Sequence, residues 1–314
     1  DFCDVLIVGS GPAGIAAALN AAEHKLDVML VEQDNELGGS ELNESSSNID
    51  QNVLALKEAG VKIKKRTTAF GLYDYGVAGL LERITDHQSL PSEYDPRQRF
   101  WTVRTKHIIL ATGAIERPIA FGNNDRPGVM SVAASRTYLN RFAILPGKKI
   151  IICTNNDSAY LPASELSKVG AEVKLIDARS GIEDSLSGEV LKNGVNLQMN
   201  AAPLNVNGSR SVRSLDIAVA KGDKWQRGNT EIYDLVLVSG GWSPVVHLLS
   251  HRGIRPIWDK LNACFIPDKY SEPITMAGSA SGIWDKDKCI ISGKVAGLRA
   301  ADSIGIKTKS YSFP

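Results

Sequence analysis

The sequence comprises 314 residues, of which 43% are hydrophobic and 23% charged, and its formal net charge is +1. This composition is typical of a soluble globular protein that is long enough for two domains. A net charge so close to zero argues against nucleic acid or a membrane surface as a partner, and no apolar run approaches the roughly 18 residues that span a bilayer.

The first 32 residues predict a dinucleotide-binding strand–helix–strand unit. The apolar run at residues 5–8 predicts a strand buried on both faces. Gly9, Gly11 and Gly14 follow at G-x-G-x-x-G spacing. A helix and a second strand come next, and that strand ends in Glu32. In this context Gly9 permits the tight turn, Gly11 lets backbone amides approach a pyrophosphate, and Gly14 lets helix and strand pack closely.

The acid at the end of the second strand indicates which dinucleotide is bound. Glu32 is predicted to accept hydrogen bonds from the adenosine ribose hydroxyls, and it disfavours a 2′-phosphate. NAD and FAD are therefore favoured over NADP, and the acid suits both alike. In the following "DNELGGS", Gly38 and Gly39 would let a loop pass close to the ribose or pyrophosphate, with Ser40 as a donor. A flexible loop without ligand contact is the alternative.

Two later segments are predicted to complete this first unit. A strand runs into the "ATG" turn at residues 111–113, which is typical of the end of a first nucleotide domain. Near the end of the chain come a strand, a turn at Gly278 and a long helix. The N-terminus of that helix is expected to face the middle of the cofactor or its flavin end.

A second unit repeats the frame of the first but not its glycines. Cys153 ends a buried strand and Asp177 lies 24 residues later, just as Glu32 lies 24 residues after Val8. The intervening turn at residues 154–160, "TNNDSAY", contains no glycine. The spacing predicts a second Rossmann-like unit whose turn cannot bring its backbone close to a pyrophosphate.

Together these patterns predict an α/β fold with two Rossmann-like dinucleotide-binding domains in a glutathione-reductase-like arrangement, one inserted in the other. The first domain is expected to comprise residues 1–120 and 240–314. The inserted domain, with the degenerate nucleotide loop, is expected at residues 121–239.

Three strings carry a resemblance to a known family: "ATGAIERPIAFGNNDRPGVM", "TNNDSAY" and "VSGGWSPVVHLLSH". They resemble the alpha subunit of heterotetrameric sarcosine oxidase over nearly the whole chain, and related alpha subunits belong to opine-type and other amino-acid dehydrogenases. The resemblance places this region between an N-terminal ferredoxin-like domain and a C-terminal folate-binding domain. The chain begins at Asp1, just before a predicted strand, which favours a piece of something longer.

The resemblance also implies cofactors and partners. It implies NAD in the place where relatives of the fold bind FAD, a substrate-oxidising FAD in a beta subunit, and an FMN at the interface of the two subunits. Further small subunits and a cytoplasmic location are expected. The turn at residues 154–160 would be a vestigial site, because its bulky side chains hold the backbone away from a phosphate and Asp157 repels one. The isolated chain is then expected to be inactive as an amine-oxidising enzyme.

Two other functions remain open. One is a self-sufficient oxidoreductase with FAD in the first site and NADH in the second, and the other is a scaffold that binds no nucleotide. The glycine-poor turn and the absence of a C-x-x-C pair favour the sarcosine-oxidase-like module. The four cysteines, Cys3, Cys153, Cys264 and Cys289, are far apart and fit a reducing compartment.

No catalytic residue is assigned, and no metal site is expected. His247 and His251 have the i, i+4 spacing of metal ligands, but no further ligand joins them, so surface or interface packing is preferred. Ser89–Arg99 is interpreted as a surface excursion. The residues predicted to bind the dinucleotide are Gly9, Gly11, Pro12, Ala13, Gly14, Glu32, Gln33, Gly39, Ser40, Ala69, Ala111, Thr112, Gly113, Gly278, Ser279 and Trp284.

Overall fold

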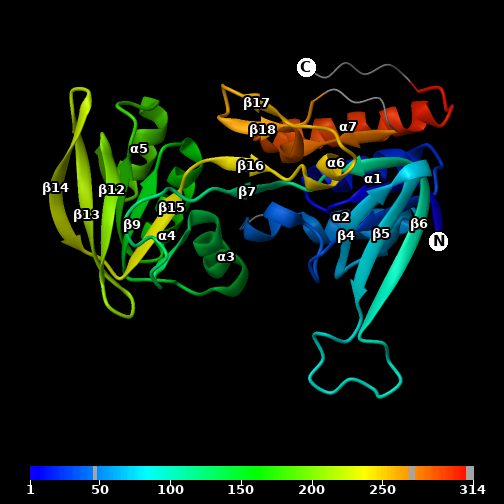
Figure 1. Ribbon diagram of the computed structural model, residues 1–314, viewed down its shortest axis with the longest axis horizontal. Helices are drawn as coiled ribbons and strands as arrows, with labels where there is room; N and C mark the ends of the chain where they lie inside the picture. The colour runs from blue at the N-terminus through cyan, green and yellow to red at the C-terminus, as the bar shows by residue number, and fades with distance from the viewer. Residues whose placement is uncertain (45–47, 269–272, 309–314) are drawn as a thin grey trace. The chain divides into compact units, whose positions relative to one another are not determined.

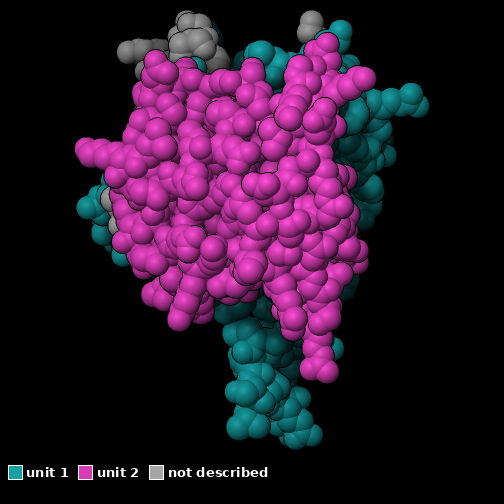
Figure 2. Space-filling view, turned by 90° about the vertical axis from the view of Figure 1, so that its left-hand side faces the viewer, with its two compact units in different colours: residues 1–115, 244–314 teal, residues 116–243 magenta. Residues whose placement is uncertain are grey.

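The fold was analysed in a computed structural model that describes residues 1–44, 48–268 and 273–308. The chain forms two compact units (Figure 2). Unit 1 comprises residues 1–115 and 244–314, and unit 2 comprises residues 116–243. The chain passes from one unit to the other twice, in the short paired strands β7 (Ala114–Glu116) and β16 (Trp242–Pro244).

Unit 1 is built on a sheet in the order β3-β2-β1-β6-β5-β4, with β19 also beside β6. Figure 1 labels β4, β5 and β6 of this sheet. Its strands are β1 (Phe2–Val8), β2 (Val28–Val31), β3 (Lys62–Lys64), β4 (Thr67–Tyr73), β5 (Val77–Arg83), β6 (Gln98–Leu110) and β19 (Ile274–Met276), with a separate hairpin of β17 (Ile257–Asp259) and β18 (Cys264–Ile266). Its helices are α1 (Pro12–Glu23), α2 (Ile49–Glu58), α6 (His247–His251) and α7 (Lys286–Ser303), and its 3₁₀ turns are η1 (Gly39–Asn43), η2 (Asp74–Gly76) and η4 (Gly278–Ser281).

The parallel register of β1 and β2 positions the two ends of the predicted site. All four residues of β2 are buried, which explains its continuous apolar run. Val8 pairs with Val31, so the residues that follow, Gly9 and Glu32, leave the sheet at the same edge. In parallel sheets this carboxyl edge is where ligands bind.

Small residues let α1 and α7 approach each other closely. A Cβ added to Gly293 would lie 2.1 Å from the carbonyl oxygen of Ala13, and one added to Gly297 would lie 2.9 Å from that of Ala17. The facing residues of α1 are mostly alanines. Because no larger side chain fits between the two backbones, α7 is held against the helix that follows the glycine turn.

Unit 2 contains a parallel sheet in the order β11-β10-β9-β15-β8, and a separate antiparallel sheet of β12, β13 and β14. Its strands are β8 (Val129–Ser131), β9 (Lys149–Thr154), β10 (Glu172–Asp177), β11 (Asn196–Met199), β12 (Ala201–Gly208), β13 (Val212–Lys221), β14 (Lys224–Ile232) and β15 (Leu235–Ser239). Its helices are α3 (Val132–Phe142), α4 (Tyr160–Lys168) and α5 (Asp184–Lys192), with the 3₁₀ turn η3 (Asp157–Ala159) before α4.

The residues of β9 alternate between two hydrophobic clusters. Ile150 and Ile152 pack in the cluster that contains the apolar residues of α4, whereas Ile151 and Cys153 pack in the cluster formed with β12 and β13. Both faces of this central strand are therefore buried, as its unbroken apolar sequence predicts.

The predicted surface excursion is an exposed loop between β5 and β6 (Figure 1). The loop occupies residues 84–97. The last two residues of the predicted excursion, Gln98 and Arg99, belong instead to β6, where they pair with Arg83 and Glu82 of β5.

A buried histidine makes the stability of unit 1 dependent on pH. His107 is 4% exposed, and its two ring nitrogens lie 2.9 Å from Thr275 Oγ1 and 2.7 Å from Ser303 Oγ. Burial lowers the pKa of His107 to about 4, from 6.5. Since the unfolded chain takes up this proton first, the stabilising contribution is complete above pH 6.5 and is lost as the pH falls from 6.5 to 4.

We therefore expect His107→Gln to weaken the pH dependence of stability in this window. Between pH 7.5 and pH 5 the wild-type chain should lose about 2 kcal/mol from this residue, at 1.36 kcal/mol per pKa unit. Urea denaturation at both pH values measures the difference. The matched control is His87→Gln, at an exposed histidine. An unchanged pH dependence in the His107 variant would exclude this role.

Candidate functional site

The glycine turn after β1 packs too tightly for any side chain at two of its positions. Gly9 has a φ of +100°, and an added Cβ would lie 2.3 Å from the carbonyl oxygen of Ala111. A Cβ on Gly14 would lie 1.9 Å from the carbonyl oxygen of Gly9. These contacts bring the end of β1, the start of α1 and the end of β6 together, as the motif predicts.

Gly11 differs from its two neighbours because the space beside it is open. A Cβ added there would meet no atom within 4 Å among the described residues. Gly11 is the N-cap of α1 and supplies no side-chain cap, while Pro12 occupies the first helical turn. An uncapped helix N-terminus beside open space can hold a phosphate through its backbone amides and dipole.

The loop that follows β2 lies against this turn. A Cβ on Gly39 would lie 3.0 Å from Gly11 Cα, and the amide of Gly38 donates to the carbonyl oxygen of Ser10 at 3.0 Å. Close approach of two backbones explains Gly39, whereas Gly38 has a φ of +127° and an added Cβ would lie 2.5 Å from the side chain of Ile49. Ser40 is exposed within η1.

Glu32 is held firmly at the edge of the sheet. It is 9% exposed, and its Oε2 accepts from the Ser10 amide at 2.9 Å and from Ser10 Oγ at 2.7 Å. Its Oε1 accepts from the amide of Asp34 at 2.9 Å. A carboxylate oxygen can accept two hydrogen bonds, so Oε1 keeps capacity for a ribose hydroxyl. Ser10 and Asp34 were not predicted; Ser10 is an unspecified position of the glycine motif, which carries no residue signal.

The turn at Gly278 also packs against α1, at Ala13. Gly278 has a φ of +68°, and an added Cβ would lie 2.7 Å from the Cβ of Ala13. Its amide donates to Ser292 Oγ at 3.2 Å. Ser279, which is half-buried, follows in η4. The N-terminus of α7 is capped by its own residue, since Asp285 accepts from the Lys288 amide at 2.9 Å.

An ion-pair cluster that sequence reasoning missed ties η1 to α7. Lys286 Nζ lies 2.8 Å from Glu41 Oε1 and 2.7 Å from Glu44 Oε2. Hydrogen bonds to Glu41 and then Glu44 raise the pKa of Lys286. Because the lysine lies 242 positions after the nearer acid, only the fold brings these residues together.

Three further predicted residues, Thr112, Gly113 and Trp284, form hydrogen bonds within the protein. Thr112 Oγ1 donates to the carbonyl oxygen of Val245 at 2.7 Å, and the amide of Val245 donates to the carbonyl oxygen of Gly113 at 3.0 Å. These two hydrogen bonds join the segment that follows β6 to Val245. Trp284, which is 40% exposed, donates from Nε1 to Asn262 Oδ1 at 2.9 Å.

Two predicted residues lie toward the edge of the sheet. Gln33 is exposed directly after Glu32, and its carbonyl oxygen accepts from Arg83. Ala69 lies in β4 and pairs with Leu80 of β5.

In the histidine pair of α6, His251 packs against β4. His251 Nδ1 lies 2.9 Å from the carbonyl oxygen of Leu72, and its ring makes an edge contact with Tyr73. In the described part of the chain no group of three or more His, Cys, Asp or Glu side chains is arranged to hold a metal ion. None of the described helices is long and apolar enough to cross a membrane.

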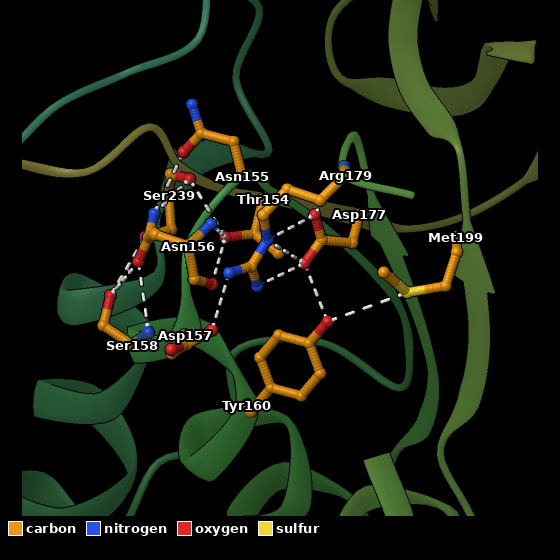
Figure 3. A network of polar contacts seen from close by, with 10 residues as sticks. All are labelled: Thr154, Asn155, Asn156, Asp157, Ser158, Tyr160, Asp177, Arg179, Met199 and Ser239. Carbon is orange, nitrogen blue, oxygen red and sulfur yellow. Dashed lines mark hydrogen bonds and ion pairs between the residues drawn. The ribbon is translucent and has the colours of Figure 1, made fainter. Parts of the chain in front are cut away.

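The turn at residues 154–160 is filled by a network of its own side chains (Figure 3). Thr154 Oγ1 and Asn156 Nδ2 both donate to the carbonyl oxygen of Ser239, at 3.2 and 3.0 Å. Asp177 is fully buried and accepts from Tyr160 Oη at 2.7 Å. These contacts connect the ends of β9, β10 and β15.

Comparison with known proteins identifies relatives. The chain matches the family described as pyridine nucleotide-disulphide oxidoreductase over residues 3–258. It is 35% identical to the alpha subunit of sarcosine oxidase from Corynebacterium sp. (strain P-1), covering 97% of this chain and 33% of that protein. It is 26% identical to an opine oxidase subunit from Agrobacterium tumefaciens (strain Ach5), covering 99% and 68%. The chain thus spans about a third of the length of the sarcosine oxidase relative, and the resemblance drawn from its three strings is confirmed.

A solved structure supports the fold. Thioredoxin reductase of T. acidophilum superposes with a TM-score of 0.73 at 19% identity, covering 97% of this chain and 99% of that one. At this identity the likeness concerns the fold alone. Together with the family match it confirms the predicted α/β class with two Rossmann-like domains.

Proposed function

Because the chain belongs to the pyridine nucleotide-disulphide oxidoreductase family, we propose that it holds a single dinucleotide, NAD, between the glycine turn, Glu32 and the Gly278 turn. Unit 1 is then the dinucleotide-binding domain, and unit 2 is an inserted Rossmann-like domain with a degenerate nucleotide loop. The observation that carries the proposal is the open space beside Gly11, at an uncapped helix N-terminus and at the same sheet edge as a fixed carboxylate.

The residues of the site suit a dinucleotide in three places. The first amides of α1 bind the pyrophosphate beside Gly11, and the absence of a Cβ leaves room for its oxygens. Glu32 accepts from the adenosine ribose and is already oriented by Ser10 and Asp34. The Gly278 turn, in contact with Ala13, lines the opposite side. NAD would supply a nicotinamide in its second half, and the protein supplies binding and orientation.

The biological role proposed is that of the alpha subunit of a multi-subunit amine-oxidising flavoenzyme similar to sarcosine oxidase. The relatives named above are subunits of oxidases, which supports partner subunits. In this proposal a beta subunit oxidises the CH–NH bond with its FAD, and an FMN lies where the two subunits meet. Further small subunits, a ferredoxin-like domain and a folate-binding domain complete the complex, in the cytoplasm.

The thiol chemistry of the chain fits a non-catalytic role for its dinucleotide. Disulphide reduction needs an accessible thiolate with a lowered pKa. The four cysteines are outside any disulphide bond, and all four are buried. Burial raises the pKa of Cys3 to about 11 and also raises the pKa of Cys153 and Cys289. None of these three thiols is poised to react.

The identity of the nucleotide tests the proposal directly. The purified chain is denatured, and the released small molecule is identified by mass spectrometry. We expect NAD at about one equivalent and no flavin absorbance. Release of FAD would overturn the assignment of NAD, and release of no nucleotide would favour a scaffold role.

A self-sufficient FAD-dependent NADH oxidoreductase is the second candidate. It is favoured by the match to the pyridine nucleotide-disulphide oxidoreductase family over residues 3–258. Assay of NADH oxidation with artificial electron acceptors separates the candidates. We expect no turnover by the isolated chain, whereas rates of about 1–10³ per second would support the second candidate.

Glu32→Ala is expected to weaken NAD binding by at least about tenfold. One lost hydrogen bond to a charged group corresponds to about 1.5–3 kcal/mol, and 1.4 kcal/mol is one decade in affinity. The affinity for NADP should fall much less, or rise, because the carboxylate no longer repels the 2′-phosphate. Calorimetric titration of both nucleotides measures this, with Glu23→Ala as the matched control at an exposed carboxylate of α1. Equal NAD affinities in wild type and variant would remove the ribose role.

A further inference from the structure

Unit 2 repeats the strand–turn–helix order and the spacing of the dinucleotide site, although the turn itself has another backbone conformation: the φ of Gly9 is +100°, whereas the φ of Thr154 is not positive. Thr154 pairs with Asp177 across β9 and β10, at the position equivalent to Gly9 and Glu32 in unit 1. Both pairs are separated by 23 residues. Counting from the strand end, Asn156 is then equivalent to Gly11. Gly11 is the N-cap of α1, and Asn156 is the N-cap of the 3₁₀ turn η3 that leads into α4.

At the phosphate position a side chain replaces the open space. Asn156 Oδ1 accepts from the Ser158 amide at 3.1 Å and from Ser158 Oγ at 2.5 Å. An amide at this helix N-terminus, which would otherwise face a pyrophosphate, therefore already has an acceptor. In unit 1 the equivalent Gly11 provides no such cap.

At the ribose position, both carboxylate oxygens of Asp177 already accept hydrogen bonds from the protein (Figure 3). Asp177 is 0% exposed, and its Oδ2 accepts from Tyr160 Oη and from an Nη of Arg179, both at 2.7 Å. Its Oδ1 accepts from the backbone amide of Arg179 at 2.9 Å and from its Nε at 3.1 Å. The other Nη of Arg179 donates to Asp157 at 2.7 Å. A ribose hydroxyl would have to displace a charged, bidentate partner to reach this carboxylate.

We infer that unit 2 closes its own dinucleotide site with side chains: Asn156 takes the place of the pyrophosphate, and Arg179 takes the place of the adenosine ribose. Asp157 adds a carboxylate that repels phosphate and anchors Arg179. The inference deepens the proposed function, because it gives the physical reason why a chain with two such frames holds a single dinucleotide. It also predicts that replacement of these side chains raises the affinity of unit 2 for a dinucleotide fragment.

The test removes the first site and then opens the second. All variants carry Gly11→Val, so that binding reports on unit 2, and ADP-ribose is the probe because it contains both the ribose and the pyrophosphate. The opened variant adds Asn156→Gly and Arg179→Gln. The side-chain amide of the glutamine can still donate a hydrogen bond to Asp177, but it carries no charge. The matched control adds Asn229→Gly and Arg213→Gln, at exposed residues of unit 2 outside the turn and the network that close the site. Calorimetry measures affinity, and thermal melting verifies the fold.

We expect the Gly11→Val parent and the matched control to bind no ADP-ribose, and the opened variant to gain affinity by at least about tenfold. Tight binding by the parent would overturn the inference, because unit 2 would then be open. A folded opened variant without gain would overturn it as well. If the opened variant does not fold, Asn156→Gly alone is titrated with inorganic pyrophosphate, and absence of a gain counts against the inference. Failure of the proposed function is seen separately, as absence of NAD binding when Gly11 is intact.

Discussion

Gly11→Val is expected to abolish dinucleotide binding and to leave the fold intact. The φ of Gly11 is −68°, which valine adopts readily, and an added Cβ meets no protein atom within 4 Å among the described residues. In the proposed complex the branched side chain would therefore stand where the pyrophosphate binds. Loss of two charge-assisted hydrogen bonds, at about 1.5 kcal/mol each, lowers affinity by at least about a hundredfold.

The measurement is calorimetric titration of NAD, with thermal melting to compare stability. Gly181→Val is the matched control, since Gly181 is exposed in unit 2 and its added Cβ also meets nothing within 4 Å. Both variants should melt close to wild type, and only Gly11→Val should lose NAD. Undiminished binding in the Gly11 variant would sink the assignment of the site.

Arg179→Met is expected to destabilise unit 2 by about 3 kcal/mol. The change leaves Asp177 fully buried without its cationic partner, and removal of one member of a buried ion pair costs about 3–5 kcal/mol. The lower end applies because the arginine side chain is 32% exposed and water can reach part of the gap. Methionine retains most of the apolar stem, so the loss reports on the charge.

Urea denaturation provides the comparison, with the transitions of the two units analysed separately if they do not coincide. Arg97→Met is the control, because Arg97 pairs with Asp86 but its side chain is 82% exposed. Surface pairs of this kind contribute little to stability, because water screens the charges. A loss in the Arg179 variant no larger than in the Arg97 variant would contradict the importance of the buried pair.

The class of fold and the frame of the site follow from local sequence. A strand buried on both faces needs a continuous apolar run, and a turn with a φ of +100° needs glycine, so β1 and Gly9 are visible in the residues themselves. Gly14 is required by a contact of its helix with a turn only five residues away. The equal spacing of Glu32 and Asp177 from their strands likewise reveals two Rossmann-like units.

The sequence does not reveal what each acid contacts. Glu32 and Asp177 occupy equivalent places, yet Glu32 is held by neutral donors from Ser10 and Asp34, whereas Asp177 is neutralised by Arg179. An arginine two residues after an acid has many rotamers, and the ion pair of Arg179 with Asp157 of η3 favours the one that turns back.

The sequence by itself therefore determined the α/β class, the two strand–helix–strand frames and the glycine turn, because these depend on backbone conformation and on residues a few positions apart. The tertiary structure alone decided that Lys286 joins Glu41 and Glu44 from the far end of the chain. It also decided that Arg179 turns back onto Asp177, while the place beside Gly11 stays open. Side-chain partners of this kind are chosen by the desolvation of buried charges, which has no periodic signal in the chain.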